Sequence, residues 1–116
     1  MFDFENLEVY KFSKELNVEI FKFLKSKYNL NSYLVNQLSR AVISMVINIA
    51  EGSGKSTNRS KRNFYSIARS SVYECVSLFD IMLAEKSIEI EEYQYYYLKF
   101  EIVSKMLYNL MKSIES

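Results

Sequence analysis

Residues 93–114 have the sequence YQYYYLKFEIVSKMLYNLMKSI, the most regular pattern in the chain. Apolar side chains recur there at alternating spacings of three and four residues, at Tyr93, Tyr96, Phe100, Val103, Leu107, Leu110 and Ile114. An α-helix brings residues with this spacing onto one face, as in a heptad repeat. The stretch therefore predicts an amphipathic helix whose apolar face packs against other helices.

The rest of the chain shows the same helical period and no alternation long enough for a strand. The expected core positions are Val9, Phe12, Leu16, Ile20 and Phe23 in a first segment, Leu34, Leu38, Ala41, Met45 and Ile49 in a second, and Phe64, Ile67, Ser71, Cys75, Leu78 and Met82 in a third. Stripes of this kind indicate core packing rather than a cofactor site. Cys75 is accordingly expected to be a buried, unreactive thiol.

Three polar breaks separate these segments. The clearest contains both glycines, Gly52 and Gly54, and the two weaker ones fall at residues 26–32 and 85–88. The predicted helices span approximately residues 5–26, 32–51, 59–85 and 89–114. Short connections between long helices favour antiparallel neighbours. We therefore predict a single all-α domain over residues 1–116, an antiparallel up-down-up-down four-helix bundle.

Composition narrows the classes of function. The chain has 116 residues, 49% of them hydrophobic and 16% aromatic, which is enough apolar material for one core and excludes general disorder. The chain contains no His and one Cys, which removes His-based catalytic groups and Cys-rich metal sites. We therefore expect a protein that is not an enzyme and holds no metal or cofactor. No apolar run is long enough to span a bilayer and no export signal is visible, so the cytoplasm is the expected location.

The near-neutral net charge of +1 conceals an uneven distribution. Residues 31–72 carry a net charge of +5, and residues 73–116 carry −4. The acid-free stretch between Glu51 and Glu74 holds five cations, which are Lys55, Arg59, Lys61, Arg62 and Arg69. Arginines together with an aromatic ring can grip phosphates and stack on a base. The alternatives are a solvated face, or a face that docks on the acidic half of a neighbouring subunit.

Part of this positive charge is expected to lie on one face of the third predicted helix. Its polar residues Arg59, Arg62, Ser66, Arg69 and Tyr73 follow spacings of three and four, so they form one ridge. A ridge of this size on one subunit is expected to bind nucleic acid weakly. Repetition of the ridge around an oligomer would strengthen the field and the binding.

A second polar line runs along the second predicted helix, through Gln37, Arg40, Ser44, Asn48 and Glu51. In a structural interpretation, Arg40 pairs with an acid across the bundle, such as Glu74, while Asn48 and Glu51 cap the following loop. In a functional interpretation, the same groups line a pore or groove. The structural interpretation is the one we favour.

Five tyrosines lie away from the predicted core stripes, at Tyr10, Tyr73, Tyr95, Tyr97 and Tyr108. Tyrosine outside the core is a frequent interface residue. One small bundle is not expected to leave so much aromatic surface in water. A homo-oligomer is therefore predicted in preference to a monomer.

The run from Gln37 to Gly52, QLSRAVISMVINIAEG, resembles the second helix of the bacterial 23S rRNA intervening-sequence proteins. Its pattern is Gln-x-x-Arg-Ala followed by Ser-Met and Asn-Ile-Ala-Glu-Gly. Further matches are Phe4, Leu7, Val9 and Tyr10 at the start, Phe64 and residues 67–71 in the third helix, Glu74, and Met106 with Leu107 near the end. The polar residues that match are Gln37, Arg40, Ser44, Asn48, Glu51, Gly52 and Glu74.

This resemblance implies a cytoplasmic bacterial four-helix bundle that assembles as a ring, with a pentamer as the expected size. Proteins similar to these are not enzymes by themselves. A related branch, the accessory variability determinants of diversity-generating retroelements, binds nucleic acid through basic surfaces and has a reverse transcriptase as its partner. Two departures are the Val46-Ile47 pair, where Pro or Ser is frequent, and the near-neutral charge.

Two functions follow from these observations. The first is a non-enzymatic, oligomeric accessory protein that binds RNA or an RNA/DNA hybrid through Lys55, Arg59, Lys61, Arg62 and Arg69. The second is a homo-oligomeric scaffold that binds protein partners and makes no contact with nucleic acid.

Overall fold

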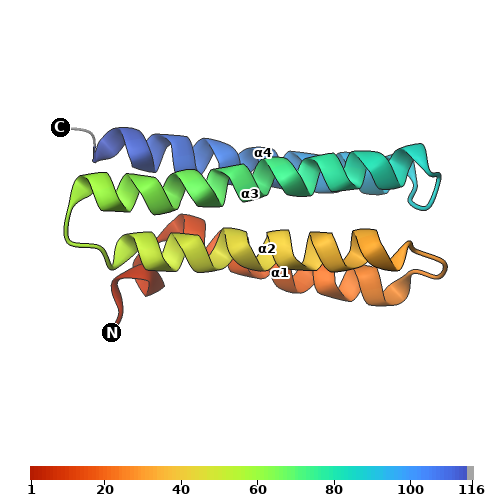
Figure 1. Cartoon of the computed structure of the whole chain (residues 1–116), viewed down its shortest axis with the longest axis horizontal. Helices are drawn as coiled ribbons and strands as arrows, with labels where there is room; N and C mark the ends of the chain where they lie inside the picture. The colour runs from red at the N-terminus through yellow and green to blue at the C-terminus, as the bar shows by residue number, and fades with distance from the viewer. Residues whose placement is uncertain (115–116) are drawn as a thin grey trace.

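The computed structural model describes residues 1–114 and consists of four helices in that range, with no strand. The helices are α1 (Glu8–Ser26), α2 (Ser32–Ser53), α3 (Asn58–Ala84) and α4 (Ile90–Ser113), preceded by a short 3-10 helix, η1 (Asp3–Asn6). Each helix runs in the opposite direction to the one before it, and the pair α1–α2 lies against the pair α3–α4 (Figure 1). The molecule is a rod of 46 × 24 × 21 Å. The predicted all-α four-helix bundle is confirmed.

Local hydrogen bonds explain where the helices begin. The Asn31 side chain accepts from the backbone N–H groups of Tyr33 and Leu34 and so caps α2. Thr57 caps α3 in the same manner, with its hydroxyl oxygen 3.1 Å from the Ser60 nitrogen. At the start of α4, the Glu92 carboxylate accepts from the Glu89 N–H at 2.8 Å.

The first helix is shorter than predicted. It begins at Glu8 rather than at residue 5, because Leu7 has an extended backbone (φ −76°, ψ 124°) that separates it from η1. In η1 the carboxylate of Glu5 accepts a hydrogen bond from the Phe2 N–H at 2.7 Å. The acidic start of the chain thus forms its own turn and leaves the helical axis.

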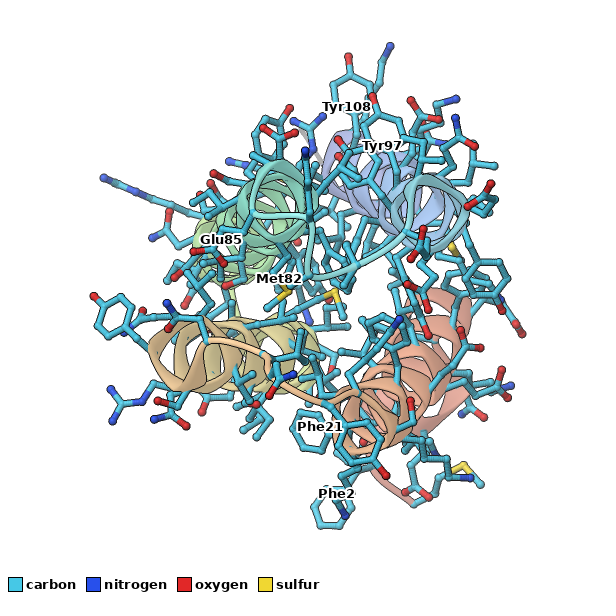
Figure 2. All side chains as sticks on the ribbon, turned by 90° about the vertical axis from the view of Figure 1, so that its right-hand side faces the viewer. Phe2, Phe21, Met82, Glu85, Tyr97 and Tyr108 are labelled. Carbon is cyan, nitrogen blue, oxygen red and sulfur yellow. The ribbon has the colours of Figure 1, made fainter. Side chains whose placement is uncertain are left out.

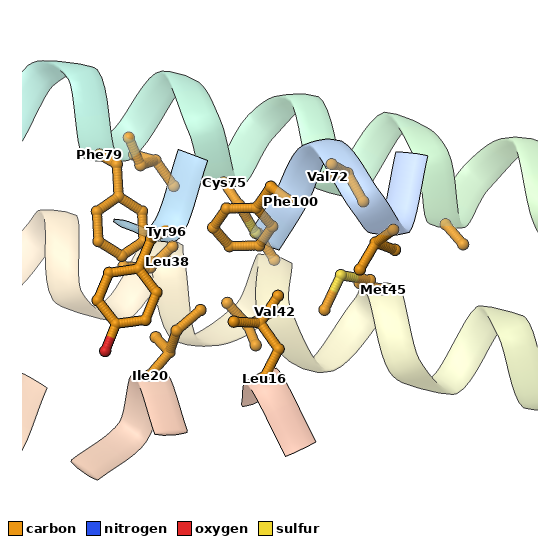
Figure 3. Close-up of a cluster of buried hydrophobic side chains, with 14 of the residues drawn as sticks. Leu16, Ile20, Leu38, Val42, Met45, Val72, Cys75, Phe79, Tyr96 and Phe100 are labelled. Atoms are coloured by element: carbon orange, nitrogen blue, oxygen red, sulfur yellow. The ribbon is translucent and has the colours of Figure 1, made fainter. Parts of the chain in front are cut away.

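The core lies along the axis of the rod, between the four helices (Figure 3). Its largest fully buried side chains come from every helix and include Ile20, Leu38, Met45, Phe79 and Phe100. Burial of each such side chain contributes about 1.5–3 kcal/mol. These contributions hold the four helices together and fix which face of each helix remains in water.

Aromatic rings fill the half of the core near the α3–α4 loop. Phe79 lies 5.1 Å from the Tyr96 ring and 5.8 Å from the Phe100 ring, measured between ring centres. Phe23 of α1 joins them at 5.1 Å from Tyr96. These large side chains set the spacing between α4 and its neighbours.

One predicted core residue is misplaced. Ile67 is 47% exposed, whereas its neighbour Ala68 is fully buried. The buried face of α3 is centred on Ala68, Val72 and Cys75, so Ile67 falls at its edge.

The closest helix pair is α2–α3. The hydroxyl groups of Ser44 and Ser71 lie 2.9 Å apart across it, and the small residues Ala41 and Ala68, each three residues before one of these serines, are buried. Near the connecting loop, Gly52 packs directly against the Tyr65 ring; a Cβ atom on Gly52 would come within 2.6 Å of that ring. We call this contact the α2–α3 seam.

No helix within residues 1–114 is long and apolar enough to cross a membrane. No group of three or more Cys, Asp or Glu side chains is arranged to hold a metal ion in that range. Cys75 is fully buried, as predicted, and burial raises the pKa of its thiol, with the nearby Glu74 carboxylate adding to the effect.

Candidate nucleic-acid interface

Two arginines of α3 bond to α4 or to the residue that follows it, and a third shares their helical spacing. The guanidinium group of Arg62 donates to the backbone carbonyl of Ile114 at 3.3 Å, and Nε of Arg69 donates to the Ser104 hydroxyl at 3.1 Å. Arg59, in the first turn of α3, is exposed and follows the same helical spacing. We call Arg59, Arg62 and Arg69 the α3 arginine ridge.

Arg69 is held more firmly than the other two. Its guanidinium carbon lies 5.7 Å from the centre of the Tyr73 ring and 5.5 Å from that of Tyr108, so two aromatic rings flank it. Cation–π contacts of this kind stabilise a positive charge at a surface. With the bond to Ser104, these contacts fix the direction of a half-buried guanidinium group.

The two predicted lysines lie elsewhere. Lys61 turns toward α2, where its ammonium group donates to the backbone carbonyl of Ser53 at 2.8 Å and so satisfies the end of that helix. Lys55 lies over the Phe64 ring, 4.7 Å from its centre. The five predicted cations therefore do not form one cluster, and the ridge consists of the three arginines.

The ridge has no carboxylate partner among residues 1–114. The ion pairs in that range are Lys11–Glu8, Lys27–Glu92 and Lys99–Glu19, and none includes the arginines of α3 or the lysines near the loop. The positive charge of α3 is thus not neutralised inside the described part of the chain. Such a field attracts anions, and salt weakens the attraction.

A groove of about 610 Å³ runs between α3 and α4 beside the ridge. We call it the α3–α4 groove. It is lined by Arg69, Val72, Tyr73, Val76, Ser77 and Asp80 of α3 and by Tyr93, Tyr97, Phe100, Glu101, Ser104 and Lys105 of α4. Figure 2 shows Tyr97 and Tyr108 on the outer side of α3 and α4, away from α1 and α2.

The sequence singled out some of the tyrosines on this side of the molecule but did not indicate that a groove lies there. Tyr73, Tyr97 and Tyr108 stood out as tyrosines away from the core stripes, and all three are exposed in the structure. Periodicity assigns each of them to a helix face. It does not indicate that two of those faces meet at one groove, because that depends on the crossing of α3 and α4.

The polar line of α2 divides into two parts. Asn48 and Ser44 belong to a small network with Ser71, in which the Asn48 amide donates to the backbone carbonyl of Ser44 at 2.8 Å. Asn48 therefore bonds back along its own helix and does not cap the loop. For Glu51, the backbone carbonyl and not the carboxylate accepts from the Gly54 N–H.

The outer part of this line is exposed. Arg40, Glu51 and Glu74 all lie in water, and the expected pair between Arg40 and Glu74 is absent from the ion pairs of residues 1–114. Gln37 is half-buried at the edge of α2. Within the predicted network, Gly52 is thus buried, Gln37, Ser44 and Asn48 are half-buried, and the three charged residues are exposed.

Comparisons with known proteins agree with the architecture. No curated protein sequence matches this one. A crystal structure of a protein of unknown function from the S23 ribosomal protein family of Bacteroides thetaiotaomicron superposes with a TM-score of 0.80 and 21% identity, covering 90% of this chain and 98% of the other. That likeness supports the fold alone. The family model of the 23S rRNA-intervening sequence proteins matches residues 5–109, and the chain therefore belongs to that family.

Proposed function

We propose that this protein is an RNA-binding accessory protein that acts by binding rather than by catalysis. The observation that supports this most strongly is the α3 arginine ridge, whose three guanidinium groups have no carboxylate partner among residues 1–114. Guanidinium groups are well suited to phosphate oxygens, because their N–H donors form a planar fork. Membership of a family named after insertions in 23S rRNA is consistent with an RNA ligand.

The charge distribution adds to this argument. Residues 31–72 carry +5 and the following residues carry −4, so one part of a nearly neutral molecule attracts polyanions. A ridge of three arginines provides few phosphate contacts. Binding by one subunit is therefore expected to be weak and sensitive to salt. A homo-oligomer, with a pentameric ring as the proposed form, would present several ridges together and increase the overall affinity.

A second function is a homo-oligomeric scaffold without nucleic-acid contact. Exposed apolar residues favour it, because Ile43 and Ile47 of α2 and Ile67 of α3 are each 40–48% exposed on neighbouring helices. Arg40 and Glu74 are also exposed on these two helices. This face has the mixture of apolar and charged groups that a contact between subunits or with another protein would use.

Charge reversal on the ridge tests the proposal. The triple variant Arg59→Glu, Arg62→Glu, Arg69→Glu is compared with wild type for binding of labelled single-stranded RNA by fluorescence anisotropy. We expect a large loss of affinity, and a log–log salt dependence less steep by about 2, since each phosphate contact on a single strand contributes about −0.7.

The matched control reverses three exposed lysines of α1, with Lys14→Glu, Lys22→Glu and Lys25→Glu. Both variants have the same net charge, so a local effect of the ridge is separated from general repulsion. Equal loss in the two variants, or unchanged binding in the arginine variant, would contradict the proposal. A protein partner that co-purifies with a chain unable to shift RNA at low salt would favour the scaffold instead.

A further inference from the structure

The two ends of the α3–α4 groove differ in charge. Arg69 and Lys105 line one end, together with Glu101 one helical turn before Lys105. Asp80 lies further along α3, close enough to Tyr93 that its charge contributes to a raised pKa of that tyrosine, after the larger effect of burial. At 1.5 Å per residue, Arg69 and Asp80 are about 16 Å apart along the helix axis. The groove therefore has a donor for anions at one end and an acceptor for hydrogen bonds at the other.

Between these ends the groove is aromatic. Tyr73 is 62% exposed and Tyr97 is 42% exposed, although both line a concave surface. Tyr93 lies beside Tyr97, with 5.8 Å between ring centres. Flat, partly exposed rings on two helices offer faces on which another planar group can stack. Any nucleobase can stack on such a ring, because every base has a flat aromatic face.

The guanidinium group of Arg69 is held in place without a ligand, and in the described part of the chain most of its N–H donors are free to bind an anion. A guanidinium group has five N–H donors, and within residues 1–114 Arg69 uses only the one on Nε, toward Ser104. Tyr73 and Tyr108 restrict its side chain. A fixed donor group loses little conformational freedom when it binds, so its remaining N–H groups are available at low entropic cost.

We propose that the α3–α4 groove binds one unpaired nucleotide of an RNA single strand. In this arrangement Arg69 takes a phosphate next to that nucleotide, the base stacks against Tyr73 or Tyr97, and Asp80 accepts from an amino group on the base edge. The inference rests on the proposed function and gives it a substrate class, which is single-stranded rather than duplex RNA. The volume of about 610 Å³ lies within the range of about 300–1,000 Å³ that is usual for small-ligand sites.

Charge argues for this occupant over a helix from a second copy of the chain. The acidic last third of this sequence could meet Arg69, but its several carboxylates would also meet Asp80 and Glu101 of the same groove. A single nucleotide instead places one phosphate at Arg69 and an uncharged base over the rest of the groove. A nucleotide has its anionic phosphate on one side and hydrogen-bond donors on its base. It therefore matches both ends of the groove, whereas the last part of the chain, with eight acids and four lysines in residues 73–116, offers mainly carboxylates.

The experiment measures binding of a short oligoadenylate and of a blunt RNA duplex of the same charge, by fluorescence anisotropy at low salt. Tyr73→Leu combined with Tyr97→Leu removes the stacking faces without changing charge. We expect single-strand affinity to fall about tenfold or more, and duplex affinity to change less than about twofold. Tyr33→Leu is the matched control, because Tyr33 is 68% exposed in the first turn of α2 and does not line the α3–α4 groove.

The possible results separate the two proposals. If the arginine variant loses RNA binding while the double tyrosine variant binds the single strand like wild type, the groove proposal is wrong and the proposed function stands. Equal losses for single strand and duplex would also overturn the groove proposal. If wild type binds neither RNA at low salt, both proposals fail. Circular dichroism of each variant shows whether the bundle remains folded.

Discussion

The α2–α3 seam and the α3–α4 groove are built on the same helix and differ in the size of their side chains. At the seam, Ser44 and Ser71 are small enough for their hydroxyl groups to meet at 2.9 Å, and Gly52 lies against Tyr65 without a Cβ atom between them. In the groove, Arg69, Tyr97 and other large side chains stand between the helices on the outer side.

Because of this difference, one helix has a closed contact on one side and an open groove on the other. Small residues bring backbones together and exclude solvent, which stabilises the bundle. Large polar and aromatic residues on the opposite flank leave a concave surface with exposed rings and a fixed guanidinium group. Substitutions in the seam are therefore expected to lower the free energy of unfolding strongly. Substitutions in the groove are expected to change it little and to weaken the proposed RNA binding instead.

The same substitution in both places has the largest expected effect. Ser71→Leu puts a large side chain into the closed seam and is expected to lower the free energy of unfolding by about 3 kcal/mol. Ser104→Leu, in the groove, is expected to cost less than about 1 kcal/mol, because its side chain enters open space. Urea denaturation followed by circular dichroism measures both. Similar costs at the two sites would remove the distinction between seam and groove.

A methyl group at Gly52 tests the seam more finely. Its Cβ would lie 2.6 and 2.8 Å from two carbon atoms of the buried Tyr65 ring, so we expect Gly52→Ala to destabilise the fold by about 2 kcal/mol. Gly54→Ala is the control. The nearest atom there would be 3.7 Å away and φ is −89°, so the free energy of unfolding should change by less than about 0.5 kcal/mol. Thermal unfolding of the two variants decides the point.

A smaller effect concerns the side of α4 opposite the groove. Glu92 accepts from the Glu89 N–H at 2.8 Å and pairs with Lys27, the residue after α1, at 2.7 Å. Partial burial raises the pKa of Glu92, but these two contacts outweigh it and leave the pKa below its ordinary value. Glu92→Ala is expected to cost about 1 kcal/mol at neutral pH.

The pH dependence has a definite sign. Because the folded pKa of Glu92 is lowered, its stabilisation is present above the ordinary glutamate pKa of about 4.3 and is lost as pH falls through the folded value. Glu92→Gln keeps an acceptor for the Glu89 N–H and loses only the charge. The stability difference between wild type and Glu92→Gln should therefore shrink below about pH 4. A difference independent of pH would show that the charge contributes nothing.

The sequence predicted the bundle because the apolar period is strong. In α4 the alternating spacing assigned Tyr96, Phe100, Val103 and Leu107 to the core, and all four are buried. The prediction that Ile67 lies in the core was wrong, because apolar character and helical period alone cannot distinguish it from Ala68. The distinction depends on how α3 is rotated about its own axis in the bundle, which contacts with the other helices set.

The candidate site was predictable only in part. Helical spacing brought Arg59, Arg62 and Arg69 to one side of α3, because that is a property of a single helix. Helical spacing could not predict that Lys61 bonds to the end of α2, since the carbonyl of Ser53 belongs to another helix. The groove itself depends on how two helices cross, which no pattern within one helix contains.

The central claim is that the arginines of α3, beside the groove, are the contact surface for RNA. Nuclear magnetic resonance of the labelled protein, titrated with a short oligoadenylate, tests it directly. The account predicts the largest shift changes at the Nε–H group of Arg69 and at the rings of Tyr73 and Tyr97. Changes confined to α1 and α2, or no change at saturating oligoadenylate, would contradict it.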